Sequence, residues 1–240
     1  MSNSNTIFDV QFMLDSFGKL MPYFPITLLI VAVAYICGLL IGLGCAIVKV
    51  YRIPVLLQIV DAYVSFIRGT PLLVQLYLIY FGIPVVIRLW NANFGTDYPT
   101  HGVPALLSVF IAYSLGDGAY FAETIRGAIE AVDRGSVEAA EAFGMTRGRT
   151  LLRVILPQAL LIAMPNLGNM LLMLMKNTSL AFTIGVVDIM GQGKIIASSG
   201  YRFFEVYIAL AVIYWCSCFV LARITGFVEK RLNVQRNRTA

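Results

Sequence analysis

Apolar stretches long enough to cross a lipid bilayer recur along the chain. An α-helix rises about 1.5 Å per residue, so about 20 apolar residues span the ~30 Å hydrocarbon core. The clearest such stretch is Leu20–Val48, which carries no charge between Lys19 and Lys49. Because an unpaired backbone group in lipid costs several kcal/mol, we expect each stretch to be a helix. The five expected spans are approximately residues 20–48, 53–87, 98–122, 154–175 and 206–228.

The composition excludes a soluble domain of this length. Hydrophobic residues make up 59% of the 240 residues, charged residues make up 13%, and the mean hydropathy is +0.80. A soluble domain carries about 25% charged residues, so a surface of this composition could not be kept in water. The sequence therefore predicts an all-α integral membrane protein, in which residues 1–240 form one transmembrane domain. Residues 1–18 contain no Lys or Arg, so we interpret residues 1–19 as an external segment of the mature chain and not as a signal peptide.

The basic residues predict the orientation in the membrane. The net charge is +5 and the pI is near 9.1, but the positive charges lie between apolar stretches. This placement is typical of cytoplasmic membrane flanks and argues against nucleic acid as a partner. With the C-terminus inside, 13 of the 18 Lys and Arg residues lie in cytoplasmic segments and the other 5 lie outside, so we expect an external N-terminus and a cytoplasmic C-terminus. The 13 are Lys49, Arg52, Arg68, Arg126, Arg134, Arg147, Arg149, Arg153, Arg223, Lys230, Arg231, Arg236 and Arg238.

The sequence offers no pattern typical of catalysis or metal binding. Cys216 and Cys218 lack metal-ligand spacing, and the single histidine, His101, is far from them in sequence. The phosphate-binding loop of an ATPase needs Gly-x-x-x-x-Gly-Lys-Ser/Thr. Its only candidate, around residues 193–195, has isoleucine in place of Ser/Thr and lacks the first glycine. We therefore expect no metal, no cofactor bound by this chain and no enzymatic activity.

The longest expected cytoplasmic connection is residues 123–153, and within it the loop of residues 133–153 contains the signals of a short helix. Ser136 is the expected N-cap, Gly144 can end the helix in the left-handed conformation, and Thr146 can cap a second helix. A helix of about two turns is marginal by itself, so another surface must support it. Small alanines allow close approach of that surface, and Phe143 adds an apolar side chain. From these residues alone, docking into a partner's groove and packing onto the chain's own membrane domain remain equally open.

This connection resembles the cytoplasmic signature of ATP-binding-cassette (ABC) importer permeases. The signature is a Glu-Ala-Ala triplet, a glycine four residues after the second alanine, and a Leu-Pro pair. The chain has Glu138-Ala139-Ala140, Gly144 and Leu156-Pro157, with Val154 where isoleucine is usual. The resemblance implies the type I ABC importer permease fold and a coupling helix, residues 136–144, that sits in a groove of a separate ATPase. The residues it implies for this coupling are Glu138, Ala139, Ala140, Phe143, Gly144 and Arg147.

Further segments resemble the branch of this family that imports polar amino acids such as histidine, arginine, glutamine or cystine. They are Phe66-Ile67-Arg68-Gly69-Thr70-Pro71, Gln75, Tyr80-Phe81-Gly82-Ile83-Pro84, Ala122-Glu123-Thr124-Ile125-Arg126-Gly127, Leu156-Pro157-Gln158-Ala159-Leu160 and Lys176-Asn177-Thr178-Ser179-Leu180. Three positions depart from the usual pattern: Asn177 replaces Asp, Ser136 replaces a frequent Gln, and Asp117 lies between two glycines where Asn and small neutral residues are common. Asp117 favours an amino acid with an extra positive group, or cystine with its two ammonium groups.

Polar side chains inside membrane spans are costly, so they are candidates for a substrate pathway. Asn166 and Asn169 are three residues apart and share a helix face, as do Asp117 and Tyr120. Lys176 and its two hydroxyl neighbours could meet a carboxylate at the outer end of the fourth span. The candidate pathway residues are Asn166, Asn169, Asp117, Tyr120, Gln75, Lys176, Thr178 and Ser179.

The alternative for these polar residues is purely structural. Asn and Ser in a bundle often only bond neighbouring helices, for about 0.6–2 kcal/mol. Glu123 and Arg126, three residues apart, are expected to form an ion pair. Gly38, Gly42 and Gly44 are expected to be helix-packing contacts.

The resemblance also implies partners and a location. It implies two permease chains, identical or homologous, two ATPase subunits that use the ATP, an external substrate-binding protein and an amino-acid substrate, in the bacterial inner membrane. One alternative is a secondary transporter or channel that works alone, which would leave helix 136–144 without a partner. A membrane enzyme is the third possibility, and it lacks a catalytic constellation in the sequence.

Overall fold

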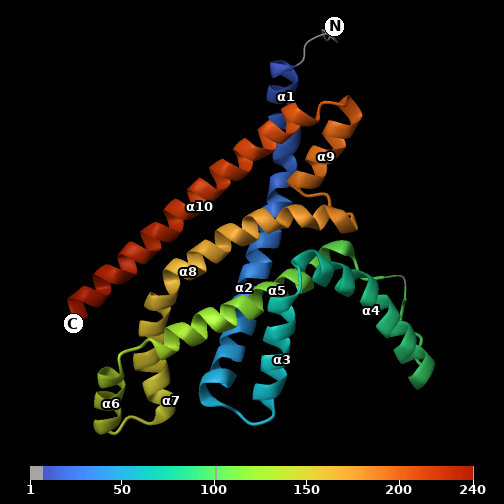
Figure 1. The fold of residues 1–240 in the computed structure, drawn as a ribbon. Helices are drawn as coiled ribbons and strands as arrows, with labels where there is room; N and C mark the ends of the chain where they lie inside the picture. The colour runs from blue at the N-terminus through green and yellow to red at the C-terminus, as the bar shows by residue number, and fades with distance from the viewer. Residues whose placement is uncertain (1–7, 101, 240) are drawn as a thin grey trace. The chain divides into compact units, whose positions relative to one another are not determined.

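The computed structural model describes residues 8–100 and 102–239, without the side chains of residues 232–239. The first seven residues of the expected external segment, His101 and the side chains of Arg236 and Arg238 lie outside the described part. Every regular element within the described ranges is helical (Figure 1). The elements are α1 (Val10–Leu20), η1 (Met21–Tyr23), α2 (Phe24–Tyr51), α3 (Leu56–Gly69), α4 (Leu72–Phe94), α5 (Ala105–Glu130), α6 (Arg134–Ala142), α7 (Arg147–Thr150), η2 (Leu151–Ile155), α8 (Leu156–Asn177), η3 (Thr178–Ile184), α9 (Ile189–Gly200) and α10 (Phe203–Thr239).

Five helical segments among the described residues are long and apolar enough to cross a membrane, which confirms the expected number and the all-α class. They are Val10–Tyr51, Leu72–Phe94, Ala105–Glu130, Arg147–Ile184 and Phe203–Arg231.

The second expected span, residues 53–87, is divided into two helices. Pro71 has no N–H to donate, and it forces the preceding residue out of the helical conformation. Thr70 is accordingly extended, with φ −120° and ψ 144°. α3 has 14 residues, about 21 Å of helix, which is too short to cross the hydrocarbon core. The membrane-spanning part of this region is therefore α4, and α3 is a separate element.

The helices form two compact units, which are described separately. Unit 1 consists of residues 1–34, 73–112 and 173–220, and unit 2 consists of residues 35–72, 113–172 and 221–240. Because each unit takes its residues from several stretches, the long helices α2, α5, α8 and α10 contribute to both.

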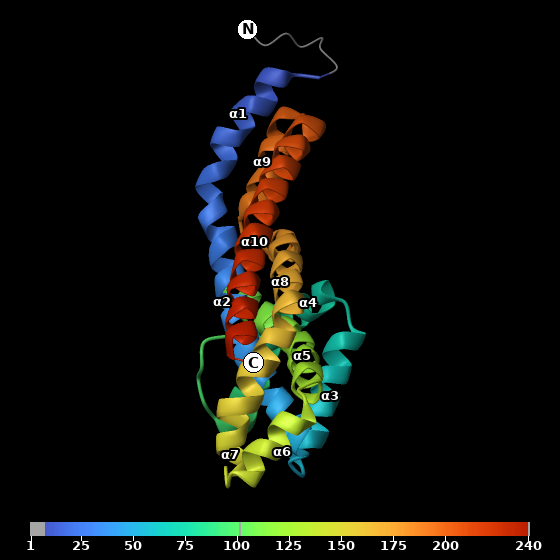
Figure 2. The same ribbon diagram turned by 90° about the vertical axis from the view of Figure 1, so that its left-hand side faces the viewer.

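The core of unit 1 is formed by α1, α9 and the first half of α10, which lie side by side (Figures 1 and 2). The Asp9 carboxylate accepts a hydrogen bond from the Phe12 N–H at 3.0 Å and caps α1. Phe12 and Phe17 then pack against this core. Helix therefore begins at Val10, within the expected external segment of residues 1–19, because its apolar face has a surface to cover.

A buried aspartate starts α9 within unit 1. Asp188 is fully buried, and its carboxylate accepts hydrogen bonds from the Gly191 N–H at 2.9 Å and the Thr27 hydroxyl at 3.3 Å. The Thr27 oxygen in turn accepts from the Ile189 N–H at 3.2 Å. Burial raises the pKa of Asp188, and these hydrogen bonds act in the opposite direction. These hydrogen bonds therefore fix the start of α9 against α2.

The core of unit 2 depends on close approach between α2 and α5. A Cβ added at Gly42 would lie 2.5 Å from the Phe121 Cβ and 2.9 Å from the Ala122 backbone nitrogen. Gly38 lies against the Phe121 ring in the same way. The packing role expected for Gly38 and Gly42 is confirmed. The expectation for Gly44 is wrong, because no described atom of another helix lies within 4 Å of a Cβ added there.

Candidate functional sites

The short helix α6 has a different N-cap from the one expected. The Asp133 carboxylate accepts from the Ser136 N–H at 2.9 Å, so the helix begins at Arg134 and Asp133 is the cap. The expected cap, Ser136, is wrong, and its hydroxyl donates to the Asp133 carbonyl at 2.7 Å. A carboxylate three residues before a free N–H is an effective cap and also suits the positive end of the helix.

The C-terminal end of α6 follows the expectation. Gly144 has φ +79°, in the left-handed region that favours glycine. Its N–H donates to the Glu141 carbonyl at 2.9 Å, and the Met145 N–H donates to the Ala140 carbonyl at 3.1 Å. These two bonds form a Schellman motif, which satisfies the last carbonyls of the helix.

α6 packs on unit 2 through one face and leaves the other free in this chain. Ala140 is buried, and Val137 packs against the core of unit 2. Glu138 and Ala139 are exposed, and the Phe143 side chain is 89% exposed. The helix therefore has a supporting surface within its own chain and presents a second surface that ends in an apolar side chain.

The segment after α6 differs in detail from the expectation. Thr146 is at the N-cap position of α7, without a capping hydrogen bond from its side chain in the described part. α7 continues through the π-helical η2 into α8, so the second loop helix and the fourth span form one helical segment, Arg147–Ile184. Arg147 is exposed and lines a cavity of about 310 Å³ in unit 2 together with Glu141 and Tyr51.

The candidate pathway residues of unit 2 lie on α5 and α8. The exposed Asn166 amide donates to the Thr124 hydroxyl oxygen at 3.0 Å, and Asn169 is also exposed. The Tyr120 side chain is exposed, with the Arg68 guanidinium 5.7 Å from its ring centroid. Asp117 is partly buried, and its Oδ2 has no hydrogen-bond partner among the described residues.

The remaining candidates belong to unit 1. Gln75 and Thr178 are buried, and the Thr178 hydroxyl donates to the Met175 carbonyl at 2.9 Å. The Ser179 hydroxyl donates to the Lys176 carbonyl at 2.9 Å. Of these four residues, only Lys176 is exposed. The two hydroxyl groups thus satisfy carbonyls at the end of α8 in this conformation.

The family model described as "Binding-protein-dependent transport system inner membrane component" matches residues 38–234 of the chain. The chain belongs to this family. It is similar to the probable amino-acid ABC transporter permease protein PatM of Vibrio harveyi, with 39% identity over 94% of this chain and 97% of that protein. It is also similar to the L-cystine transport system permease protein TcyL of Bacillus subtilis, with 36% identity over 96% of this chain and 94% of that protein.

Solved structures of ABC transporters agree with this assignment. A crystal structure of an amino acid ABC transporter with histidines has a TM-score of 0.80 at 34% identity, covering 94% of this chain and 100% of the other. An inward-facing structure of the MetNI methionine ABC transporter has a TM-score of 0.70 at 18% identity, over 90% of this chain and 96% of the other, and supports the fold alone. The expected type I importer permease fold is confirmed.

The protein is therefore a permease subunit of an amino-acid ABC importer and a multi-pass inner-membrane protein. Its role is that of a transporter subunit. Membership of the family implies an ATPase and a substrate-binding protein as partners.

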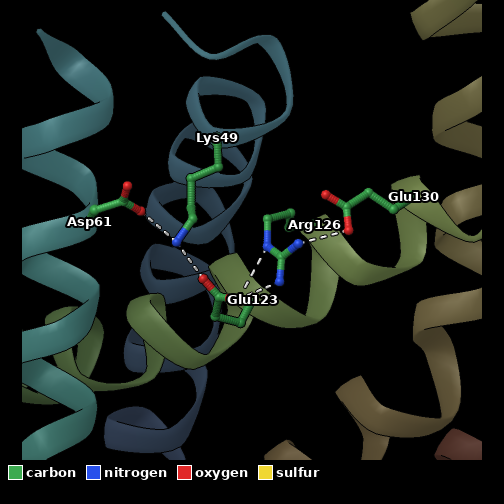
Figure 3. Close-up of polar contacts among 5 residues, drawn as sticks. All are labelled: Lys49, Asp61, Glu123, Arg126 and Glu130. Carbon is green, nitrogen blue, oxygen red and sulfur yellow. Dashed lines mark hydrogen bonds and ion pairs between the residues drawn. The ribbon is translucent and has the colours of Figure 1, made fainter. Parts of the chain in front are cut away.

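The permease also contains a charge cluster, here called the Lys49 cluster, that joins three helices of unit 2. The Lys49 ammonium on α2 lies between the Asp61 carboxylate on α3, at 2.7 Å, and the Glu123 carboxylate on α5, at 2.6 Å (Figure 3). Arg126 pairs with Glu123 at 2.8 Å and with Glu130 at 2.7 Å. The expected Glu123–Arg126 ion pair is present, as part of this larger cluster.

Sequence reasoning did not identify Lys49 and Asp61 as partners. In the sequence, Lys49 marks the boundary of the first apolar stretch and counts among the cytoplasmic basic residues, whereas Asp61 lies within the second expected span and has no assigned role. A charge inside an apolar stretch needs a partner of opposite sign, which is the signal that could have linked them. Their separation in sequence is short, but the contact depends on how α3 folds back along α2.

Proposed function

We propose that this permease forms the pathway for a polar amino acid and is driven by a separate ATPase that docks on α6. The observation that carries the proposal is the exposed face of α6, with Glu138 and Ala139 exposed and Phe143 89% exposed at its end. An apolar side chain held at the end of a capped helix suits insertion into a groove. The family likeness makes an ATPase the expected owner of that groove.

The energy for import comes from outside this chain in our proposal. The sequence lacks the Gly-x-x-x-x-Gly-Lys-Ser/Thr loop that binds ATP phosphates, so the chain binds no cofactor and the ATPase subunits use the ATP. The complete importer contains two ATPase copies, a second permease chain, identical or homologous, and an external substrate-binding protein. The N-terminus is external and the C-terminus cytoplasmic, as the distribution of basic residues favours.

The substrate we propose is a cationic amino acid or cystine. Two relatives, TcyL and TcyB of Bacillus subtilis, are named as L-cystine transport permeases. In this chain, Asp117 supplies a carboxyl group between two buried glycines, and its Oδ2 lacks a hydrogen-bond partner among the described residues. A substrate ammonium group would provide one. Tyr120, Asn166 and Asn169 would line the same pathway, and Lys176 would meet the substrate carboxylate. We assign Gln75, Thr178 and Ser179 to the same pathway, as the sequence predicts.

Co-purification tests the docking surface directly. The tagged permease is co-expressed with the ATPase encoded beside it, and the wild type is compared with Glu138→Lys and Gly144→Asp. Both variants should lose the ATPase while still inserting into the membrane, because one reverses a charge on the exposed face and the other strains the left-handed end of α6. Asp97→Lys is the matched control, since it makes the same charge reversal in the exposed loop between α4 and α5.

A transporter that works alone predicts a different result. In that case the purified wild type carries no ATPase and transports L-arginine or L-cystine in liposomes by itself. That outcome would reject the importer proposal and leave α6 as an ordinary loop helix. Retention of the ATPase by both variants would reject only the assignment of the docking surface.

A further inference from the structure

The part of the Lys49 cluster that belongs to α5 lies at the end of that helix, directly before α6 in the chain. After Glu130, the last residue of α5, the chain runs through the buried Val132 to the α6 cap at Asp133. Val132 and the α6 residue Val137 belong to the same apolar core as Ile129 of α5. The start of α6 is therefore held against the last turns of α5, so a displacement of α6 acts on the end of α5.

Glu123 connects the end of α5 to the other two helices. One of its carboxylate oxygens accepts from Lys49 at 2.6 Å, and the other accepts from Arg126 at 2.8 Å. Arg126 extends this contact to Glu130, one turn further on and next to α6. Lys49 and Glu123 are largely shielded from solvent, with 16% and 18% of their side chains exposed, so salt screens their attraction less than that of a surface pair.

α3 is attached to α5 at two further levels. The Tyr63 hydroxyl on α3 donates to the Leu115 carbonyl at 2.6 Å. At the C-terminal end of α3, the Arg68 guanidinium lies 5.7 Å from the ring centroid of Tyr120. α3 thus contacts α5 at the candidate pathway residue Tyr120, while Asp61 in the first half of α3 binds Lys49. These contacts hold α3 to α5, and the break at Pro71 separates α3 from α4. α3 can therefore move together with α5.

We propose that Lys49 is a positioning residue for transport, which transmits displacement of α6 through Glu123 to Asp61 and α3. This inference rests on the proposed docking of an ATPase at α6. In it, the ATPase displaces α6, the end of α5 follows, and the bridge from Glu123 through Lys49 to Asp61 makes α3 follow as well. Without the ammonium bridge, ATP hydrolysis continues but moves less substrate.

The test uses Lys49→Gln, Asp61→Asn and the double variant in the complete importer with its ATPase and binding protein. Lys49→Gln leaves Glu123 paired with Arg126, and Asp61 is half exposed, so neither substitution leaves a buried charge alone. The readouts are ATPase co-purification, and L-arginine and L-cystine transported per ATP hydrolysed in proteoliposomes. Lys49→Arg keeps the charge, and Lys230→Gln on α10 is a control for simple loss of one exposed lysine charge.

Each single variant should retain the ATPase. The substrate transported per ATP hydrolysed should fall by about threefold or more, as expected when one link between two coupled sites is lost. The double variant should be no worse than the more affected single variant, because both remove the same bridge. Lys49→Arg should recover most of the loss, and Lys230→Gln should match the wild type.

Additive effects of the two substitutions would overturn the inference. So would an unchanged ratio of transport to hydrolysis accompanied by less folded protein, since Lys49 would then have only a structural role. Loss of the ATPase from the Lys49→Gln complex alone would also overturn it, in favour of a role in docking. Failure of the wild type itself to bind an ATPase would instead reject the proposed function on which the inference rests.

Discussion

At the scale of single residues, the contact between α2 and α5 leaves no room for a side chain at Gly42. A Cβ there would meet the Ala122 backbone nitrogen at 2.9 Å and the Gly118 carbonyl oxygen at 3.0 Å, and backbone atoms cannot move aside as a flexible side chain can. Gly44, two residues further along the same helix, has open space around its added Cβ within the described structure. The two glycines therefore form a natural pair for comparison.

Gly42→Ala should destabilise the permease by about 1–3 kcal/mol, because the helices must separate to admit the methyl group. Gly44→Ala should be neutral or stabilise by up to about 1 kcal/mol, since alanine is the better helix former. Thermal unfolding of both variants in detergent measures the difference. Equal melting temperatures would show that the α2–α5 contact is not tight.

The buried cap of α9 provides a second prediction at this scale. Asp188→Ala removes the acceptor for the Gly191 N–H and the Thr27 hydroxyl, which are both buried. The expected cost is about 1–3 kcal/mol, the cost of leaving buried donors unsatisfied. Asp15→Ala is the control, because Asp15 is exposed and accepts from the side chain of Gln11 one turn earlier. A thermal unfolding curve of Asp188→Ala that overlies that of Asp15→Ala would contradict this account.

At the scale of the element, α6 is a nine-residue helix that depends on its ends and on its buried face. A helix of this length is marginal by itself. The Asp133 cap, the left-handed Gly144 and the burial of Ala140 together hold it in one conformation. Its exposed face can therefore meet a partner without first paying for ordering, which favours tight docking.

Gly144→Ala tests this dependence with a minimal change. An alanine in the left-handed conformation costs about 1–2 kcal/mol, so the end of α6 should fray and retain less ATPase in co-purification. Gly148→Ala is the matched control, because Gly148 lies within α7 and no described atom of another helix lies within 4 Å of a Cβ added there. If both variants retain the ATPase equally, the conformation of Gly144 does not matter for docking.

At the scale of the whole molecule, five spans require the two ends of the chain to lie on opposite sides of the membrane. Placing the C-terminus inside gives the cytoplasm 13 of the 18 basic residues, which is the favoured arrangement. A green fluorescent protein fused after Ala240 should therefore fluoresce, and alkaline phosphatase fused there should be inactive. The opposite pattern would invert the topology and place α6 on the external side, where no ATPase could reach it.

Much of the fold and part of the candidate sites could be predicted from the sequence. Span number depends on hydropathy alone, so five were found, and the end of α6 at Gly144 depends on one residue's conformational freedom. The predicted start of α6 was wrong because two nearby residues, Asp133 and Ser136, can both cap a helix. The structure has Asp133 as the cap. The predicted second span is too long because the apolar composition continues through Pro71, whereas the helix is interrupted there.

The sequence by itself determined the solvent in which this protein folds, the number of its spans and the family signature, because these follow from composition and short local patterns. Only the tertiary structure decided that Lys49 bridges Asp61 and Glu123, that Gly42 and not Gly44 lies in a helix contact, and that Thr178 is buried. Each of these depends on how one helix is rotated and placed against another. In an apolar chain nearly every helix face is hydrophobic, so the usual contrast between buried and exposed positions could not indicate that rotation.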